Sequence, residues 1–190
     1  MRTIHTYFTF AILLALALPV MGQNAAKKIP VPTDSARAEA TKLIKEVYGD
    51  ECSNAKTAVE KQALAKKLLG KANESKDDLA SQFVLLRLTR DIATQAGDRQ
   101  TAFQAIDAMA ETFQVDVLAM KVAVLTKLAT AAEKPAQHKT IAEDALKLVD
   151  GAISLDNFTV ADELGKLALA EAQNASEKEL VTELGKRGNP

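Results

Sequence analysis

Proline is absent from residues 33–134, and this absence constrains the possible folds more than any other feature of the sequence. A helix accepts proline only in its first turn, so a long proline-free stretch suits a run of helices. Alanine supplies 34 of the 190 residues, whereas there are only 6 Phe, 2 Tyr and no Trp. Alanine has the highest helix propensity, and strands are enriched in aromatic residues. The composition therefore predicts an all-α chain and excludes a β-sandwich or a β-barrel.

The charge balance and the cysteine count exclude several classes of function. The chain carries 24 Lys+Arg against 25 Asp+Glu, and its net charge of −1 does not point to nucleic acid as a partner. Cys52 is the only cysteine, which excludes a cysteine-type zinc site and an internal disulfide framework. We expect Cys52 to be buried as a small apolar residue, with an intermolecular disulfide as the alternative.

Residues 1–22 have the order of a secretory signal peptide. Arg2 precedes an apolar run over residues 7–20, and compact residues follow at 20–22. This run is shorter than the ~20 residues that a bilayer-spanning helix needs, although a retained membrane anchor is the alternative. The pattern predicts cleavage near Gly22, a secreted or periplasmic protein, and no stable membrane insertion after cleavage.

The remaining chain divides into a short linker and one domain. Residues 23–33 include Pro30 and Pro32, which restrict the backbone and remove two amide donors. A flexible, proline-containing tether is expected there, followed by a single helical repeat domain over residues 34–188. About 100–200 residues make one ordinary domain.

About eight helices are expected after the signal peptide, arranged as stacked antiparallel hairpins. The first should run from about Asp34 to Tyr48 and end at Gly49. The sequence of residues 57–60, Thr-Ala-Val-Glu, is a capping box that begins the second helix. Pro135 suits the first turn of the sixth. The helices expected over residues 79–96 and 115–132 are apolar on more than one side, which predicts neighbours on both flanks.

Apolar positions recur along the chain at a nearly constant spacing. The second and sixth helices match at an offset of 77 residues, pairing Leu64 with Ile141, Ala65 with Ala142, Leu68 with Ala145, Leu69 with Leu146 and Ala72 with Val149. The later helices match at 78, pairing Leu86 with Leu164, Ala102 with Leu180 and Ile106 with Leu184. These offsets predict two three-helix units, with the helix over residues 115–132 packed against both.

One turn and the helix after it resemble a tetratricopeptide repeat. The resemblance rests on Gly97-Asp98 followed by Ala102, Ile106 and Phe113, and on the Leu164-Gly165 pair. It implies a TPR-like short α-solenoid over about residues 55–185. The chain departs from the family where bulky rings are usual, at Leu86, Ala93 and Ala161, and it lacks the closing proline after Phe113. The whole chain also resembles helical segments near the N-termini of secreted bacterial proteins.

Residues suited to catalysis or metal binding are sparse. His138 is the only histidine outside the predicted signal peptide, and its polar neighbours in a first helical turn suggest a solvated surface residue. The acidic pairs Asp50-Glu51 and Asp77-Asp78 could hold a hard cation, but we place both at helix starts, where carboxylates interact favourably with the helix dipole. Gly-rich phosphate loops, EF-hand loops and Gly-x-Ser-x-Gly motifs are missing from the sequence. We therefore expect no enzyme, no cofactor and no catalytic or metal-binding residues.

Two surface features have ordinary structural explanations. The lysines of the second helix, Lys61, Lys66, Lys67 and Lys71, form either a solvated face or an anion-binding face. No aromatic residue is interleaved with them, which argues against nucleic-acid stacking. The sequons at Asn73, Asn157 and Asn174 fall at predicted helix ends, where Asn is a cap or turn residue.

These observations favour a non-enzymatic scaffold or adaptor that binds a protein partner. Stacked hairpins create an extended binding surface. The alternative is a helical bundle that holds an apolar small molecule in an internal cavity, because so many small residues lie on the inner faces. An enzyme with a carboxylate pair is the third hypothesis. An exposed Phe or Tyr on one face would favour the partner, and a closed, alanine-lined cavity would favour the small molecule.

Overall fold

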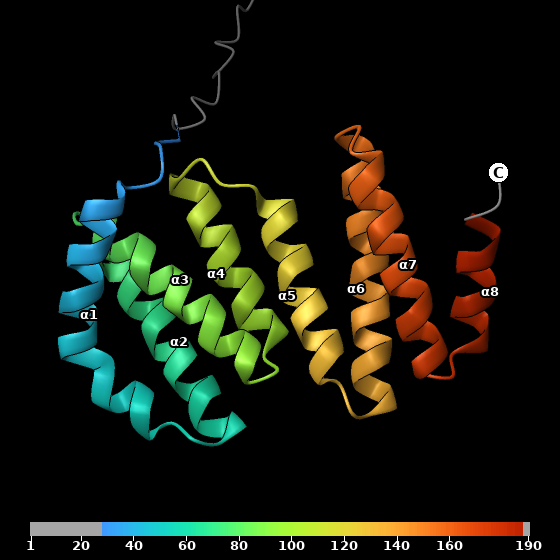
Figure 1. Cartoon of the computed structure of the whole chain (residues 1–190), viewed down its shortest axis with the longest axis horizontal. Coiled ribbons are helices and arrows are strands. Elements are labelled where there is room, and N and C mark those ends of the chain that lie inside the picture. The colour runs from blue at the N-terminus through green and yellow to red at the C-terminus, as the bar shows by residue number, and fades with distance from the viewer. Residues whose placement is uncertain (1–27, 188–190) are drawn as a thin grey trace, which may run out of the picture.

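The computed structural model describes residues 28–187, which form eight α-helices and no strands (Figure 1). The all-α fold is thereby confirmed. The helices are α1 (Asp34–Asn54), α2 (Ala58–Glu74), α3 (Leu79–Gln95), α4 (Arg99–Thr112), α5 (Val117–Ala131), α6 (Pro135–Ser154), α7 (Phe158–Asn174) and α8 (Lys178–Arg187). The predicted signal peptide, residues 1–22, lies outside the described residues.

The helices follow one another along the long axis of the molecule as antiparallel neighbours (Figure 1). The odd-numbered helices also pack in succession, α1 on α3, α3 on α5 and α5 on α7. Between residues 28 and 187, no helix is both long enough and apolar enough to cross a bilayer.

The second helix begins as its sequence predicts. Thr57 Oγ1 accepts a hydrogen bond from the Glu60 amide at 3.2 Å, and Glu60 Oε2 accepts one from the Thr57 amide at 2.9 Å. This reciprocal pair satisfies two of the amide donors that a helix start leaves free. The hydrogen bond from the Thr57 backbone lowers the pKa of the Glu60 carboxyl.

The first helix is longer than predicted, because α1 runs through Gly49 to Asn54. Its N-cap is Thr33, whose side chain accepts from the Ala36 amide at 3.3 Å. Beyond Gly49, Cys52 packs against the core and Ala55 is buried. A glycine inside a helix costs about 1 kcal/mol relative to alanine. The packing of the last turn outweighs that cost, so glycine is no stop signal here.

Three turns between helices share one backbone geometry. Gly97, Asp156 and Ser176 have positive φ angles of 70°, 54° and 60°. In each turn, the amide of the next residue donates a hydrogen bond to the carbonyl oxygen five residues before it. Those bonds join Asp98 to Ala93, Asn157 to Ala152 and Glu177 to Ala172, at 2.8, 2.9 and 3.0 Å. This pattern is the Schellman motif, in which a left-handed residue ends the helix. The accepting alanines are all fully buried, so the helices approach closely at each turn.

The same turns correct the predicted register of the repeat. Gly97 and Ser176 occupy the same position of the Schellman turn, and they lie 79 residues apart rather than 78. At this offset, buried Leu85 matches buried Leu164, and Ala93 matches Ala172. The 78-residue pairing of Leu86 with Leu164 is therefore wrong by one position. In the 77-residue match, Leu69 and Leu146 are both only half-buried.

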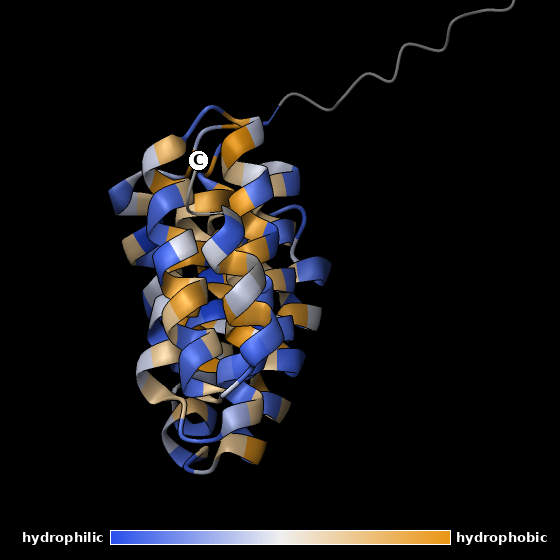
Figure 2. Ribbon diagram, turned by 90° about the vertical axis from the view of Figure 1, so that its right-hand side faces the viewer, coloured by the Kyte–Doolittle hydropathy of each residue, from blue (hydrophilic) through white to orange (hydrophobic). Residues whose placement is uncertain are grey.

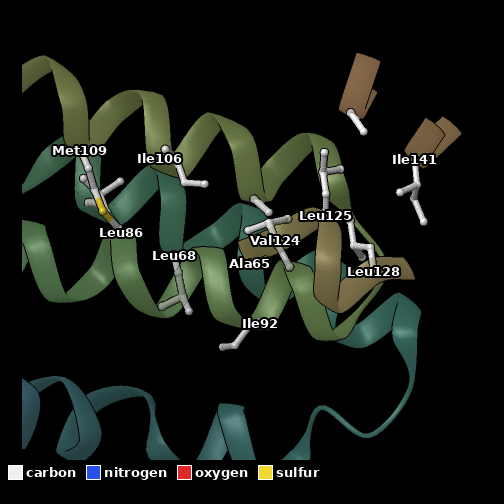
Figure 3. Close-up of a cluster of buried hydrophobic side chains, with 14 of the residues drawn as sticks. Ala65, Leu68, Leu86, Ile92, Ile106, Met109, Val124, Leu125, Leu128 and Ile141 are labelled. Atoms are coloured by element: carbon white, nitrogen blue, oxygen red, sulfur yellow. The ribbon is translucent and has the colours of Figure 1, made fainter. Parts of the chain in front are cut away.

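Helix α5 lies between the two sets of helices, as its all-round apolarity predicts. It packs on α3 and α4 on one side and on α6 and α7 on the other. Val124, Leu125 and Leu128 are buried, and they lie between Ile106 of α4 and Ile141 of α6 (Figure 3). Within the described part of the chain, the helix backbones of α1–α4 do not pack directly on those of α6–α8, and α5 lies between the two sets. Hydrophobic and hydrophilic residues alternate along the helices that face the viewer in Figure 2.

The predicted tether is wrong for residues 28–33, which are extended but docked on the helices. The Ile29 amide donates to Thr112 O at 2.9 Å, and the Gln114 amide donates to Ile29 O at 2.7 Å. Ile29 and Val31 pack against the core beside fully buried Phe113. Proline removes amide donors but leaves Ile29 free to pair, so this segment folds onto the end of α4.

The Schellman turns generate a stability prediction. Asp156→Gly should raise the free energy of unfolding by about 0.5–1 kcal/mol, because glycine adopts the left-handed conformation without a Cβ clash. The control Ala170→Gly, at an exposed position inside α7, should lower it by about 0.5–1 kcal/mol. Urea unfolding followed by circular dichroism measures both, and a loss of stability in Asp156→Gly contradicts the assignment.

Candidate functional site

Two adjoining grooves lie along α3, one on each side of this helix. The first runs between α1 and α3, with a volume of about 330 Å³. The second runs between α3 and α5, with a volume of about 490 Å³. Asp91 of α3 lines both grooves. We call the two together the α1–α3–α5 surface.

The α1–α3 groove has an apolar lining with one aromatic ring. Ile44, Tyr48 and Cys52 recur at every fourth position of α1, so they lie on one face of the helix. Val84 and Leu88 have the same spacing on α3 and form the opposite wall. The apolar lining therefore comes from two helices that pack directly on each other.

Tyr48 and Cys52 are both half-buried in this groove. The Lys67 ammonium of α2 lies 5.7 Å from the centre of the Tyr48 ring, which is within the range of a cation–π contact. Desolvation by burial, followed by the nearby Glu51 carboxylate, raises the pKa of the Cys52 thiol. Cys52 is thus a half-buried free thiol, less buried than we expected.

The apolar lining of the α3–α5 groove comes from three segments. Met120 and Val124 come from α5, and Val115 comes from the loop before it. Val31 of the docked N-terminal segment lines the groove as well. The extended residues that the sequence suggested were a tether therefore contribute to the α1–α3–α5 surface.

Some charged residues on this surface have hydrogen-bond or ion-pair partners, and others have none. Arg90 donates two hydrogen bonds to Asp91 Oδ1, at 2.8 Å from Nε and 2.6 Å from Nη2. Asp116 caps α5 and accepts from the Ala119 amide at 2.9 Å. Three cations that line the grooves, Lys45, Arg87 and Lys127, have no carboxylate within ion-pair distance in the described chain. The surface therefore offers positive charge beside apolar walls.

His138 is not the solvated surface residue that its neighbours in sequence suggest. Its Nδ1 donates to Glu171 Oε2 at 2.7 Å, and the two side chains are only 14% and 6% exposed. Asn174 Nδ2 donates to the other carboxylate oxygen at 3.4 Å. A buried carboxylate needs such partners to offset its desolvation. This pair joins α6 to α7 and lines none of the grooves described here.

The acidic pairs are explained by helix structure. Asp78 is the N-cap of α3, and hydrogen bonds from the Ser81 side chain and amide lower the pKa of its carboxyl. The prediction that Asp50 and Glu51 lie at a helix start is wrong, because both lie inside the last turns of α1. Within residues 28–187, no three His, Cys, Asp or Glu side chains are grouped so that they could hold a metal ion.

The lysines of α2 are partly engaged by acidic residues. Lys67 Nζ lies 2.7 Å from Glu51 Oε1, and Lys71 Nζ lies 2.6 Å from Glu74 Oε2. The hydrogen bond to Glu74 raises the pKa of Lys71. These pairs engage two of the four lysines, whereas Lys61 and Lys66 have no carboxylate within ion-pair distance among the described residues.

The sequon asparagines occupy helix ends as predicted. Asn157 caps α7 by accepting from the Val160 amide at 3.2 Å. Asn174 is the last residue of α7, and Asn73 lies exposed in the last turn of α2. Caps and turn positions explain all three without any modification.

A third groove, larger than the two along α3 at about 590 Å³, lies between α2, the start of α4 and the start of α6. Alanines contribute to it, but its lining also includes Gln62, Lys66, Gln100 and Gln137. Charged residues also line the two grooves along α3 and two smaller ones, a fourth between α6 and α7 and a fifth between α1 and α2. None of the five has the closed apolar lining that the small-molecule hypothesis requires.

Comparisons with protein-family models, curated proteins and solved structures find no significant match to this chain. Function is therefore inferred from the grooves, charges and contacts of the chain itself. Sequence reasoning missed Tyr48 as a groove residue, because it ended the helix at Gly49. The four-residue spacing of Ile44, Tyr48 and Cys52 is the signal that indicates a shared face.

The His138–Glu171 pair yields a prediction on stability. In a double-mutant cycle with His138→Ala and Glu171→Ala, the coupling free energy should be about 1.5–3 kcal/mol, as for a hydrogen bond to a largely buried charge. The exposed pair Lys139–Glu177, at 2.8 Å, is the control, and its coupling should not exceed about 1 kcal/mol. Equal coupling in the two cycles would show that burial adds nothing to the first pair.

Proposed function

We propose that this chain is an exported, non-enzymatic helical repeat module, TPR-like in architecture, that binds a protein partner through the α1–α3–α5 surface. The observation that carries the proposal is the half-buried Tyr48 ring in an open apolar groove that adjoins a second groove. Tyrosine is enriched at protein interfaces, because it combines a large apolar area with a polar tip. Two grooves across three helices form a binding surface larger than either groove alone.

The roles of the other candidate residues support a binding function over a catalytic one. His138 is engaged with a buried carboxylate in the packing of α6 on α7, and Asp78 caps a helix. A general base needs access to a substrate proton, which neither arrangement provides. The exported location follows from the signal-peptide pattern of residues 1–22.

Site-specific crosslinking tests this proposal. A photoreactive phenylalanine analogue is placed at Tyr48 in the chain expressed in its native host, and a second variant carries it at Val59. Val59 is 75% exposed and lies on α2, outside the α1–α3–α5 surface. We expect a protein adduct from the Tyr48 variant alone, in the secreted or periplasmic fraction, on a chain whose N-terminus lies near Gln23.

Three results would each contradict a part of the proposal. Equal adducts from both positions would show that the α1–α3–α5 surface has no special role. The absence of any protein adduct at Tyr48 would refute partner binding through this surface. Retention of residues 1–22 on the recovered chain would refute only the exported location.

A further inference from the structure

The charges of the α1–α3–α5 surface indicate what kind of partner segment fits it. The residues lining the two grooves include the cations Lys45, Arg87, Arg90 and Lys127, and the anions Asp91 and Asp116. Both anions are engaged, Asp91 by Arg90 and Asp116 as the cap of α5. Of the cations, only Arg90 has a carboxylate partner in the described chain. The positive charge left over therefore has to be matched by a ligand or by solvent ions.

The unpaired cations lie beside apolar walls on both sides of α3. Lys45 and Arg87 accompany Ile44, Tyr48 and Leu88 in the α1–α3 groove. Lys127 accompanies Met120 and Val124 in the α3–α5 groove. Each groove thus combines an apolar pocket with a cation that has no partner, so one ligand chemistry suits both.

We infer that the partner contributes an acidic segment with two apolar side chains, one for each groove. This inference rests on the proposed function and specifies the chemistry of the partner. The carboxylates of the segment lie against Lys45, Arg87 and Lys127, while the apolar side chains enter the α1–α3 and α3–α5 grooves. Complementary charge sets the specificity and the rate of such an association, and the buried apolar side chains supply most of its affinity.

The geometry also sets the spacing of the two apolar side chains. The grooves flank α3, and a helix with its side chains is about 10–12 Å wide. An extended chain in the polyproline II conformation advances about 3.1 Å per residue with three residues per turn, so residues three positions apart lie on the same side of the chain, about 9 Å from each other. An extended segment therefore needs its two apolar residues about three positions apart, with acidic residues between and around them.

Synthetic peptides test the inference on the purified full chain. The probe is a fluorescein-labelled peptide of about ten residues, made of Glu and Asp with two Leu three positions apart. A second peptide has the same composition with the two Leu adjacent, and a third carries Lys in place of every acidic residue. Fluorescence anisotropy should show the probe binding about tenfold more tightly than the lysine peptide and several-fold more tightly than the adjacent-leucine peptide.

A pair of matched double variants locates the binding. The double variant Lys45→Glu with Lys127→Glu should bind the probe about tenfold more weakly, because two favourable charge contacts become repulsive. Lys76→Glu with Lys178→Glu makes the same change in net charge at exposed lysines outside the α1–α3–α5 surface, and should change the affinity by less than about twofold. All four lysines are exposed, so the variants should fold, and circular dichroism checks this. Lys45→Gln with Lys127→Gln should give an intermediate loss.

The outcomes separate this inference from the proposed function. Equal losses in the two glutamate double variants, or equal affinity for the acidic and lysine peptides, would overturn the acidic segment. A protein crosslinked at Tyr48 through a basic or neutral segment would also overturn it, while leaving partner binding intact. A single-stranded oligonucleotide that binds as tightly as the probe would show that the surface recognises any polyanion, which contradicts the requirement for spaced apolar side chains.

Discussion

The insertion of α5 between two sets of helices is the interaction on which the rest of this structure depends. In the described chain, no helix of α1–α4 packs its backbone directly on a helix of α6–α8, whereas α5 packs on both sets. Leu125, at the centre of that helix, is fully buried among residues of both sets (Figure 3). A buried leucine contributes about 2–5 kcal/mol, as judged by truncation to alanine. Because α5 packs on both sets of helices, its side chains unite them in one core.

A charged contact supplements this apolar connection. Arg99 Nε of α4 lies 2.8 Å from Asp144 Oδ2 of α6, and the aspartate side chain is only 8% exposed. Lys147 lies 3.4 Å from the other carboxylate oxygen. A largely buried ion pair adds little net stability but is costly to break, so it favours one relative placement of the two helices. The arrangement of α4 and α6 on opposite sides of α5 is thereby specified by both shape and charge.

The same core accounts for the binding surface. Helix α3 packs on α1, α2, α4 and α5, and these contacts make the walls of the grooves that flank it rigid. Rigid walls lower the entropy that a protein loses on binding. The docked segment around Ile29 and Val31 helps to hold the end of α4 and contributes to the α3–α5 groove. Packing and the proposed binding function thus depend on the same helices.

Local patterns were predictable, whereas long-range contacts were not. The capping box at Thr57, the first-turn Pro135 and the all-round apolarity of α5 are each visible within a few residues, and the structure confirms them. The extension of α1, the docking of Ile29 and the burial of His138 all depend on partners more than 30 residues away. The register error of one position arose because alanine-rich helices match one another at several offsets, and only the turn geometry distinguishes them.

Hydrogen–deuterium exchange of Leu125→Ala tests the coupling of the two helix sets most directly. If α5 unites them in one core, the variant should lose amide protection in both α2–α4 and α6–α7, because both sets lose the same packing partner. Val59→Ala, at an exposed position on α2, should leave protection nearly unchanged in both sets. Loss of protection confined to α5 and one set of helices would contradict the account.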